Sequence, residues 1–126
     1  MMITRIILTL VVLLISPLTL ADGISGFWKH AGESVWIEIR LKEGKGTLVR
    51  NDEFPERVGF EILKSLKTEG LEQGLWRGLV YAERLGEYKD VEISLPQPDR
   101  MVFKVKVGFM SRTVEWLRVE EAPRAP

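Results

Sequence analysis

Residues 34–41 read Ser-Val-Trp-Ile-Glu-Ile-Arg-Leu, and this stretch indicates most clearly how the chain folds. Apolar and polar residues alternate along it: Val35, Ile37, Ile39 and Leu41 fall on one side of an extended chain, and Ser34, Trp36, Glu38 and Arg40 on the other. Alternation with period two, carried by β-branched residues, is typical of a strand with one buried face. Trp36 is the exception, because it shares the polar side and is expected to be exposed.

The same alternation returns in residues 91–95 and 101–107, and Gly, Asn, Asp and Pro separate the apolar runs elsewhere. Runs of this length joined by short turns predict an all-β domain. We expect an antiparallel up-and-down barrel of about eight strands, since closure removes exposed strand edges. A sandwich is the alternative. The expected strands are Ile24–His30, Ser34–Leu41, Gly46–Asn51, Val58–Leu66, Leu75–Glu83, Glu87–Leu95, Arg100–Val107 and Arg112–Val119.

One of these runs, Val58–Leu66, has an ambiguous pattern. Ile62, Leu63 and Leu66 also fit the apolar stripe of a helix, so helix and strand both stay open, with strand preferred. The segment Pro96–Asp99 is expected to be a break between strands.

The first 21 residues have the pattern of a secretory signal peptide. Arg5 is the single charge before a run of apolar residues at 6–15, and Thr19-Leu20-Ala21 places small residues at the two positions that a signal peptidase reads. We therefore expect cleavage after Ala21 and a periplasmic or secreted protein. The predicted organisation is a signal peptide at 1–21, one barrel domain at 22–119 and a frayed tail at 120–126.

The bulk composition narrows the possible functions. Removal of residues 1–21 leaves 105 residues with 17 basic and 18 acidic side chains, which suits one near-neutral domain. Such a balance gives no overall attraction to nucleic acid or to an anionic membrane. The chain has no cysteine, so disulfides, thiolate zinc sites and a lipid anchor on cysteine are excluded.

The two ends of the predicted barrel carry a matched set of residues. Gly26-Phe27-Trp28 opens the first strand, and Trp116-Leu117-Arg118 closes the last. In a closed meander these strands are neighbours, so Arg118 can cover the indole of Trp28 in a cation–π contact. Gly26, Trp28, Trp116 and Arg118 are therefore predicted to close the barrel base.

These residues resemble a known pattern. A Gly-x-Trp on the first strand with a basic residue on the last is similar to the lipocalin-like, or calycin, signature. The wider chain resembles an exported bacterial family, domain of unknown function 2147, which implies a calycin-like barrel and supplies no established activity. The residues that carry this resemblance are Gly26, Trp28, Val35–Ile39, Arg57, Gly59, Ile62, Leu63, Trp76, Gly78, Tyr81, Gly86, Tyr88, Arg112, Thr113, Trp116, Arg118 and Val119.

The polar residues form no recognisable catalytic or metal motif. His30 is the only histidine and lies beside the turn Ala31-Gly32, with no serine in a nucleophile elbow to partner it. The acidic residues Asp52, Glu53 and Glu56 match no cation-binding loop and are expected to be solvated. We therefore predict no catalytic residue, no metal, no cofactor and no enzymatic activity.

Two functions remain open. The first is a non-catalytic structural or interaction role in the bacterial envelope, exerted through the loops or through a face near Trp36. The second is binding of a small apolar or amphipathic ligand inside the barrel, because a barrel of this size either fills with side chains or holds one ligand. The candidate ligand-binding residues are Ile37, Ile39, Trp76, Tyr88, Ile93, Met101 and Phe103, with Trp76 or Tyr88 near a rim.

Overall fold

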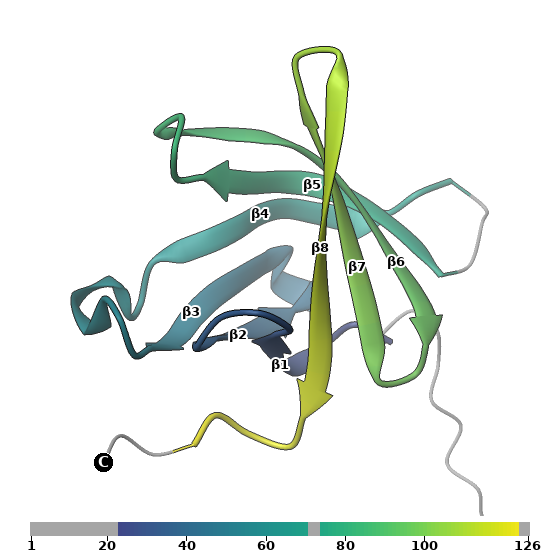
Figure 1. Cartoon of the computed structure of the whole chain (residues 1–126). Helices are drawn as coiled ribbons and strands as arrows, with labels where there is room; N and C mark the ends of the chain where they lie inside the picture. Colours follow the sequence, from purple (N-terminus) through teal and green to yellow (C-terminus); the bar gives the residue numbers. More distant parts are fainter. Residues whose placement is uncertain (1–22, 71–73, 124–126) are drawn as a thin grey trace, which may run out of the picture.

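The chain forms one closed β-barrel (Figure 1). A computed structural model describes residues 23–70 and 74–123. Each strand pairs antiparallel with the next, and the last strand pairs back with the first, so the predicted up-and-down barrel is confirmed and the sandwich is wrong. The strands are β1 Gly26–His30, β2 Val35–Arg40, β3 Lys45–Asn51, β4 Glu61–Thr68, β5 Leu75–Ala82, β6 Glu87–Gln97, β7 Arg100–Val107 and β8 Met110–Val119.

The barrel interior is built by the alternation seen in the sequence. In β2 the side chains of Ile37 and Ile39 are buried, and in β7 those of Met101, Phe103 and Val105 are buried. Neighbouring strands supply the facing residues in register, since Ile93 lies opposite Phe103. The buried cluster consists of Ile24, Trp28, Ile37, Ile39, Leu48, Leu63, Leu66, Trp76, Val80, Val91, Ile93, Met101, Phe103, Val105 and Trp116.

A β-bulge resolves the ambiguous fourth run as a strand. The register of β4 against β5 shifts between Lys64 and Lys67, and Ser65 adopts a left-handed φ of 57°. One extra residue in the strand lets Leu63 and Leu66, three positions apart, both face the core. The strand also starts later than expected, because a short 3-10 turn, η3 at Pro55–Arg57, and the residues up to Phe60 precede it.

The break expected at Pro96–Asp99 is shorter than predicted, because only Pro98 and Asp99 lie between the strands. Strand β6 continues through Pro96 to Gln97, and Gln97 pairs with Arg100 across a two-residue turn. Proline is tolerated here because β5 begins at Leu75, opposite Ser94, so that Pro96 has no partner on β5, and because the register against β7 shifts between Ser94 and Gln97.

The meander sorts the turns into two groups. The β1–β2, β3–β4, β5–β6 and β7–β8 turns lie at one end of the barrel, which we call the turn end. The opposite end, which we call the closed end, carries the β2–β3 and β6–β7 turns and the chain entering β1. A second short 3-10 helix, η2 at Leu41–Glu43, lies at the closed end. None of the helices in the described ranges is long and apolar enough to cross a bilayer. The predicted signal peptide lies outside the described residues.

Candidate functional site

The closed end is sealed by Trp28 and the residues around it. The indole of Trp28 is fully buried and donates a hydrogen bond from Nε1 to the carbonyl of Ile24, at 2.9 Å. Ile24 is also fully buried, so the segment before β1 folds under the barrel as a plug. The guanidinium of Arg118 lies over the indole, with Cζ 4.4 Å from the ring centroid. The predicted contact between Trp28 and Arg118 is confirmed.

Arg118 also ties together three parts of the closed end. It donates from Nε to the carbonyl of Pro98 in the β6–β7 turn, at 2.8 Å. Its two other nitrogens donate to the carbonyls of Gly23 and Ser25. Partial burial lowers the pKa of this guanidinium from its ordinary value, with Asp99 acting in the opposite direction. Arginine stays protonated in proteins, so the cation persists.

Gly26 makes room for this arrangement. Its φ is 126°, a conformation that side-chain-bearing residues rarely adopt. A Cβ at this position would also meet Nη1 of Arg118 at 3.4 Å. The Gly-x-Trp pattern therefore reflects a backbone requirement at the entrance to β1.

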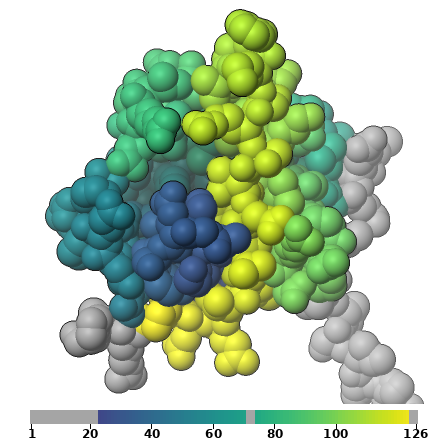
Figure 2. All heavy atoms as spheres, viewed as in Figure 1, coloured from purple at the N-terminus to yellow at the C-terminus, as the bar shows by residue number. Residues whose placement is uncertain are grey.

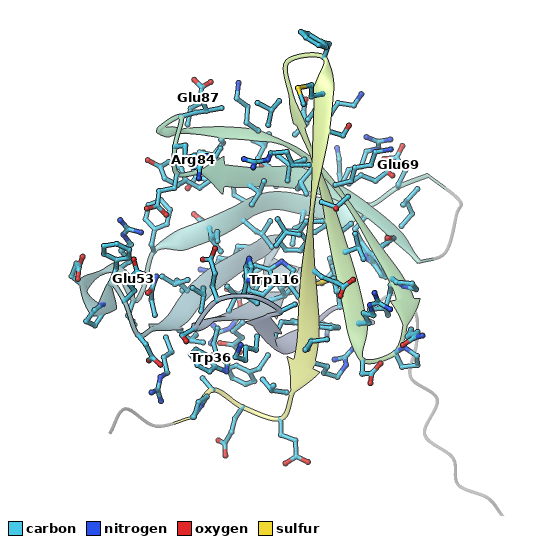
Figure 3. The ribbon with its side chains drawn as sticks, viewed as in Figure 1. Trp36, Glu53, Glu69, Arg84, Glu87 and Trp116 are labelled. Carbon is cyan, nitrogen blue, oxygen red and sulfur yellow. The ribbon has the colours of Figure 1, made fainter. Side chains whose placement is uncertain are left out.

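Trp116 lies deeper than the sequence indicated. Its register partner is His30, two positions from Trp28 toward the turn end. The ring is almost fully buried and packs against Phe103 and His30, with centroids 5.4 and 5.1 Å away (Figure 3). Trp28, Gly26 and Arg118 therefore close the base, whereas Trp116 fills the bore above it.

Six of the seven predicted ligand-binding residues form one packed cluster. Each is at most 1% exposed, and all six belong to the core: Ile37, Ile39, Trp76, Ile93, Met101 and Phe103. Their side chains face the barrel interior as members of the buried cluster. The predicted rim position of Trp76 is wrong, because Trp76 pairs with Ile93 inside the barrel.

Tyr88 is separated from this cluster. It pairs across β5 and β6 with Tyr81 on the outer face, and the two rings meet edge to face at 5.3 Å. Its hydroxyl donates to the carbonyl of Glu61, and the ammonium of Lys64 lies 4.0 Å from its ring centroid. Burial raises the pKa of this phenol, with Glu61 contributing in the same direction. Tyr88 therefore stabilises the outside of the β4–β6 sheet and does not line the bore.

Two buried polar atoms have no hydrogen-bond partner among the described residues. They are the Nε1 atoms of Trp76 and Trp116. Buried donors are almost always satisfied, so each such group calls for a reason. Both belong to the interior cluster, which gives this otherwise apolar core two donors of fixed position.

The one surface depression that can be described lies at the closed end and has a volume of about 400 Å³. It opens to solvent, and charged side chains contribute much of its lining. These residues are Ser25, Gly26, Glu38, Ile39, Arg40, Leu41, Lys42 and Glu43. Ion pairs from Arg40 to Glu38 and Glu43 hold its rim. This lining does not match the apolar site predicted from the sequence.

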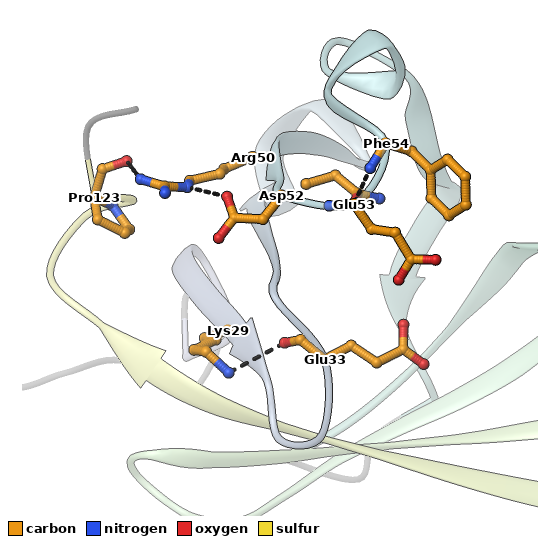
Figure 4. A network of polar contacts seen from close by, with 8 residues as sticks. Lys29, Glu33, Arg50, Asp52, Glu53, Phe54 and Pro123 are labelled. Atoms are coloured by element: carbon orange, nitrogen blue, oxygen red, sulfur yellow. Dashed lines mark hydrogen bonds and ion pairs between the residues drawn. The ribbon is translucent and has the colours of Figure 1, made fainter. Parts of the chain in front are cut away.

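The expectation that Trp36 is exposed is wrong. Trp36 does lie on the outer face, but only 8% of it is accessible. The cations of Lys29 and Arg50 lie 5.5 and 5.1 Å from its ring centroid. Arg50 is fixed in turn by Asp52 at 2.6 Å and by the carbonyl of Pro123 at 2.8 Å (Figure 4). Pro123 thus holds Arg50 in place over this ring, and Trp36 is too deeply buried to act as an exposed partner surface.

The His30 side chain caps the β1–β2 turn through a hydrogen bond with the backbone. Its Nδ1 accepts a hydrogen bond from the backbone N–H of Gly32 at 2.9 Å, which requires the neutral ring. Burial lowers the pKa of His30 below its ordinary value of 6.5, and Lys29 also lowers it while Glu33 opposes the shift.

This geometry predicts a pH dependence of stability. Because the pKa of His30 is lower in the folded state, the unfolded chain binds the proton more readily. The stability contributed by neutral His30 is therefore present above pH 6.5 and is lost as the pH falls through the folded-state pKa. Urea unfolding across this range should show a steeper decline for wild type than for His30→Asn. Superimposable pH profiles would contradict the assignment.

The acidic residues of the β3–β4 connection take part in local contacts. Within residues 23–70 and 74–123, no group of three or more potential ligands could hold a metal ion. Asp52 instead pairs with Arg50, and the side chain of Asn51 accepts hydrogen bonds from the N–H groups of Glu53 and Phe54. This loop is organised by local capping.

Exposed apolar residues gather at the turn end, and this feature escaped the sequence analysis. Six large apolar side chains are exposed in the described part of the chain, and five of them lie at that end, four in the connections between strands and one at the first residue of β8. Leu117 on β8 is the sixth. The five are Val58, Phe60, Leu85, Phe109 and Met110. For Leu85, Phe109 and Met110 the signal available in the sequence was their position between predicted strands, whereas Val58 and Phe60 were expected to lie in a strand.

No family model, curated protein or solved structure matches the chain. The resemblance to domain of unknown function 2147 therefore stays a prediction. What the barrel does has to be argued from its own side chains.

Proposed function

We propose that this protein is a non-catalytic interaction module of the bacterial envelope, exported by its N-terminal segment, which works through the turn end of its barrel. The observation that carries the proposal is that the barrel interior is packed with side chains, whereas apolar side chains are exposed at one end. The residues that would line a ligand cavity are packed against one another in the core. Five of the six exposed large apolar side chains of the described residues lie at the turn end of the barrel.

The energetics favour the same division of roles. Fully burying a large apolar side chain contributes about 1.5–3 kcal/mol, so covering the exposed part of these five side chains, from 42% of Phe60 to all of Phe109, would favour association. A single exposed apolar residue needs no explanation, whereas several on one end of a small domain are typical of an interaction surface. Charged residues lie at the same end: Figure 3 shows Glu53 and Arg84 in its connections and Glu87 at the start of β6.

A second candidate is favoured by the unpartnered indole donors. An amphipathic ligand with an oxygen acceptor could satisfy Nε1 of Trp116, which packs beside His30 near the turn end. Such a ligand would have to displace side chains of the packed bore, because its acceptor would lie among buried rings. We rank this function second for that reason.

Titration with a fatty acid, followed by Trp emission, distinguishes the two candidates. We expect no saturable change for the wild-type barrel. Phe103→Ala should create a cavity beside Trp116 and gain a binding signal, because Phe103 is buried against that ring. Leu117→Ala, an exposed position on β8, serves as the control without a cavity. Saturable binding to wild type that Phe103→Ala weakens would contradict the proposal and establish the ligand-binding function.

A further inference from the structure

The β7–β8 hairpin is the most prominent element of the turn end. Figures 1 and 2 show its tip standing clear of the rest of the barrel, in the yellow-green that marks residues near 110. Val107 pairs with Met110, so Gly108 and Phe109 form a two-residue turn. Gly108 has a φ of 65°, which suits the first central position of the turns that connect tight hairpins.

The turn presents two apolar side chains at its apex. Phe109 is fully exposed and Met110 is 61% exposed. Turn positions usually carry Gly, Asn, Asp or Ser, because these residues suit the turn backbone and solvent. Folding of the hairpin therefore does not explain a Phe-Met pair at this place.

Behind the apex lies a group of cations without matching acids. Lys104, Lys106 and Arg112 flank the tip, and the sequence from residue 100 to residue 114 contains no acidic residue. No ion pair involves these three cations within the described ranges. Glu92 lies opposite Lys104 on β6, but its carboxylate pairs with Arg77 at 2.8 Å.

The cations lie on both faces of the ribbon. Lys106 pairs with Ser111, whereas Arg112 pairs with the inward-facing Val105, so their side chains leave the hairpin on opposite faces. The result is an apolar apex with positive charge behind it on either side. This order matches the depth profile of a bilayer surface, where acyl chains lie below a layer of phosphates.

We propose that this hairpin is a membrane-contact element: Phe109 and Met110 enter the interface of a bilayer that contains anionic lipids, and Lys104, Lys106 and Arg112 contact the lipid phosphates. The inference deepens the proposed interaction function and rests on it, by naming the partner of the turn end. A neutral overall charge does not oppose it, because surface attraction depends on charges within about a Debye length of the membrane.

Vesicle co-sedimentation tests the proposal with the chain that starts at Asp22 and contains all eight strands of the closed barrel. The vesicles are phosphatidylcholine alone or phosphatidylcholine mixed with phosphatidylglycerol. Wild type should bind the mixed vesicles, bind phosphatidylcholine far more weakly and lose affinity as salt is added. Lys106→Ala and Arg112→Ala should each weaken binding about fivefold.

The apex and its controls complete the test. The double substitution Phe109→Ser with Met110→Ser should abolish sedimentation while leaving thermal unfolding near wild type, because both side chains are exposed. Leu117→Ser removes an exposed apolar side chain away from the hairpin tip, and Lys42→Ala removes a cation at the closed end. Both variants should bind the mixed vesicles as wild type does. Equal binding by the apex variant, or no binding by folded wild type, would overturn the membrane assignment. The fatty-acid titration is independent of this outcome and decides separately whether the proposed surface function stands.

Discussion

Replacing Trp28 with alanine is expected to lower the free energy of unfolding by roughly 3–5 kcal/mol, the usual range for removing a large buried aromatic side chain. The indole is fully buried at the closed end, and its removal also eliminates the hydrogen bond to Ile24 and the ring beneath Arg118. Three segments that meet there would lose their common anchor. The midpoint of thermal unfolding should fall by more than about 10 °C.

Two matched variants show whether burial is the cause. Leu117→Ala changes a neighbouring strand position that is 43% exposed, and should cost far less. Trp28→Phe keeps a ring under Arg118 but loses the Nε1 donor, and should fall between alanine and wild type. If Trp28→Ala had the same midpoint of thermal unfolding as wild type, Trp28 could not be the anchor of the barrel base.

The second large effect is expected at Gly78 in β5. A Cβ there would lie 2.9 Å from both the carbonyl oxygen of Lys64 and Cδ2 of Leu66. The backbone atoms of β4 cannot move aside as the end of a flexible side chain can. Gly78→Ala must therefore push β5 away from the bulge in β4. Overpacking of this kind typically costs about 1–3 kcal/mol.

Urea unfolding of Gly78→Ala, with Gly32→Ala as the matched control, measures this cost. Gly32 has a negative or extended φ, and its added Cβ would only meet the His30 ring at 3.8 Å. The control should therefore unfold close to wild type. Equal midpoints for Gly78→Ala and wild type would show that β4 and β5 are not packed this closely.

Much of the fold could be predicted because the strands have one buried face. Alternation in β2, β6 and β7 identifies the inward residues, and the Trp28–Arg118 pair follows once the first and last strands are neighbours. The bulge in β4 was beyond such reasoning, because one extra residue at Ser65 changes the spacing of Leu63 and Leu66 from two to three. A spacing of three also occurs in helices, which explains the ambiguity.

The candidate site was harder to predict. The parity of β6 already excludes Tyr88 from the bore, since Val91 and Ile93 face inward and an even-numbered position faces out. For Trp36 the alternation correctly predicts the outer face of the barrel. Its burial could not be predicted, because it depends on Arg50 and on Pro123, which are distant from Trp36 in the sequence. A net charge near zero also conceals the local positive charge of the β7–β8 hairpin, because a sum carries no information about position.

The central claim is that the barrel interior is filled and that the protein acts through its turn end. Two-dimensional ¹H–¹⁵N NMR of the labelled domain, recorded with bicelles containing phosphatidylglycerol, tests this claim most directly. The indole N–H signals of Trp76 and Trp116 report on the interior, and the amides of Gly108, Phe109 and Met110 report on the hairpin tip. We predict that the hairpin amides shift while both indole signals stay in place. Shifted indole signals with unchanged hairpin amides would contradict the account and place the binding site inside the barrel.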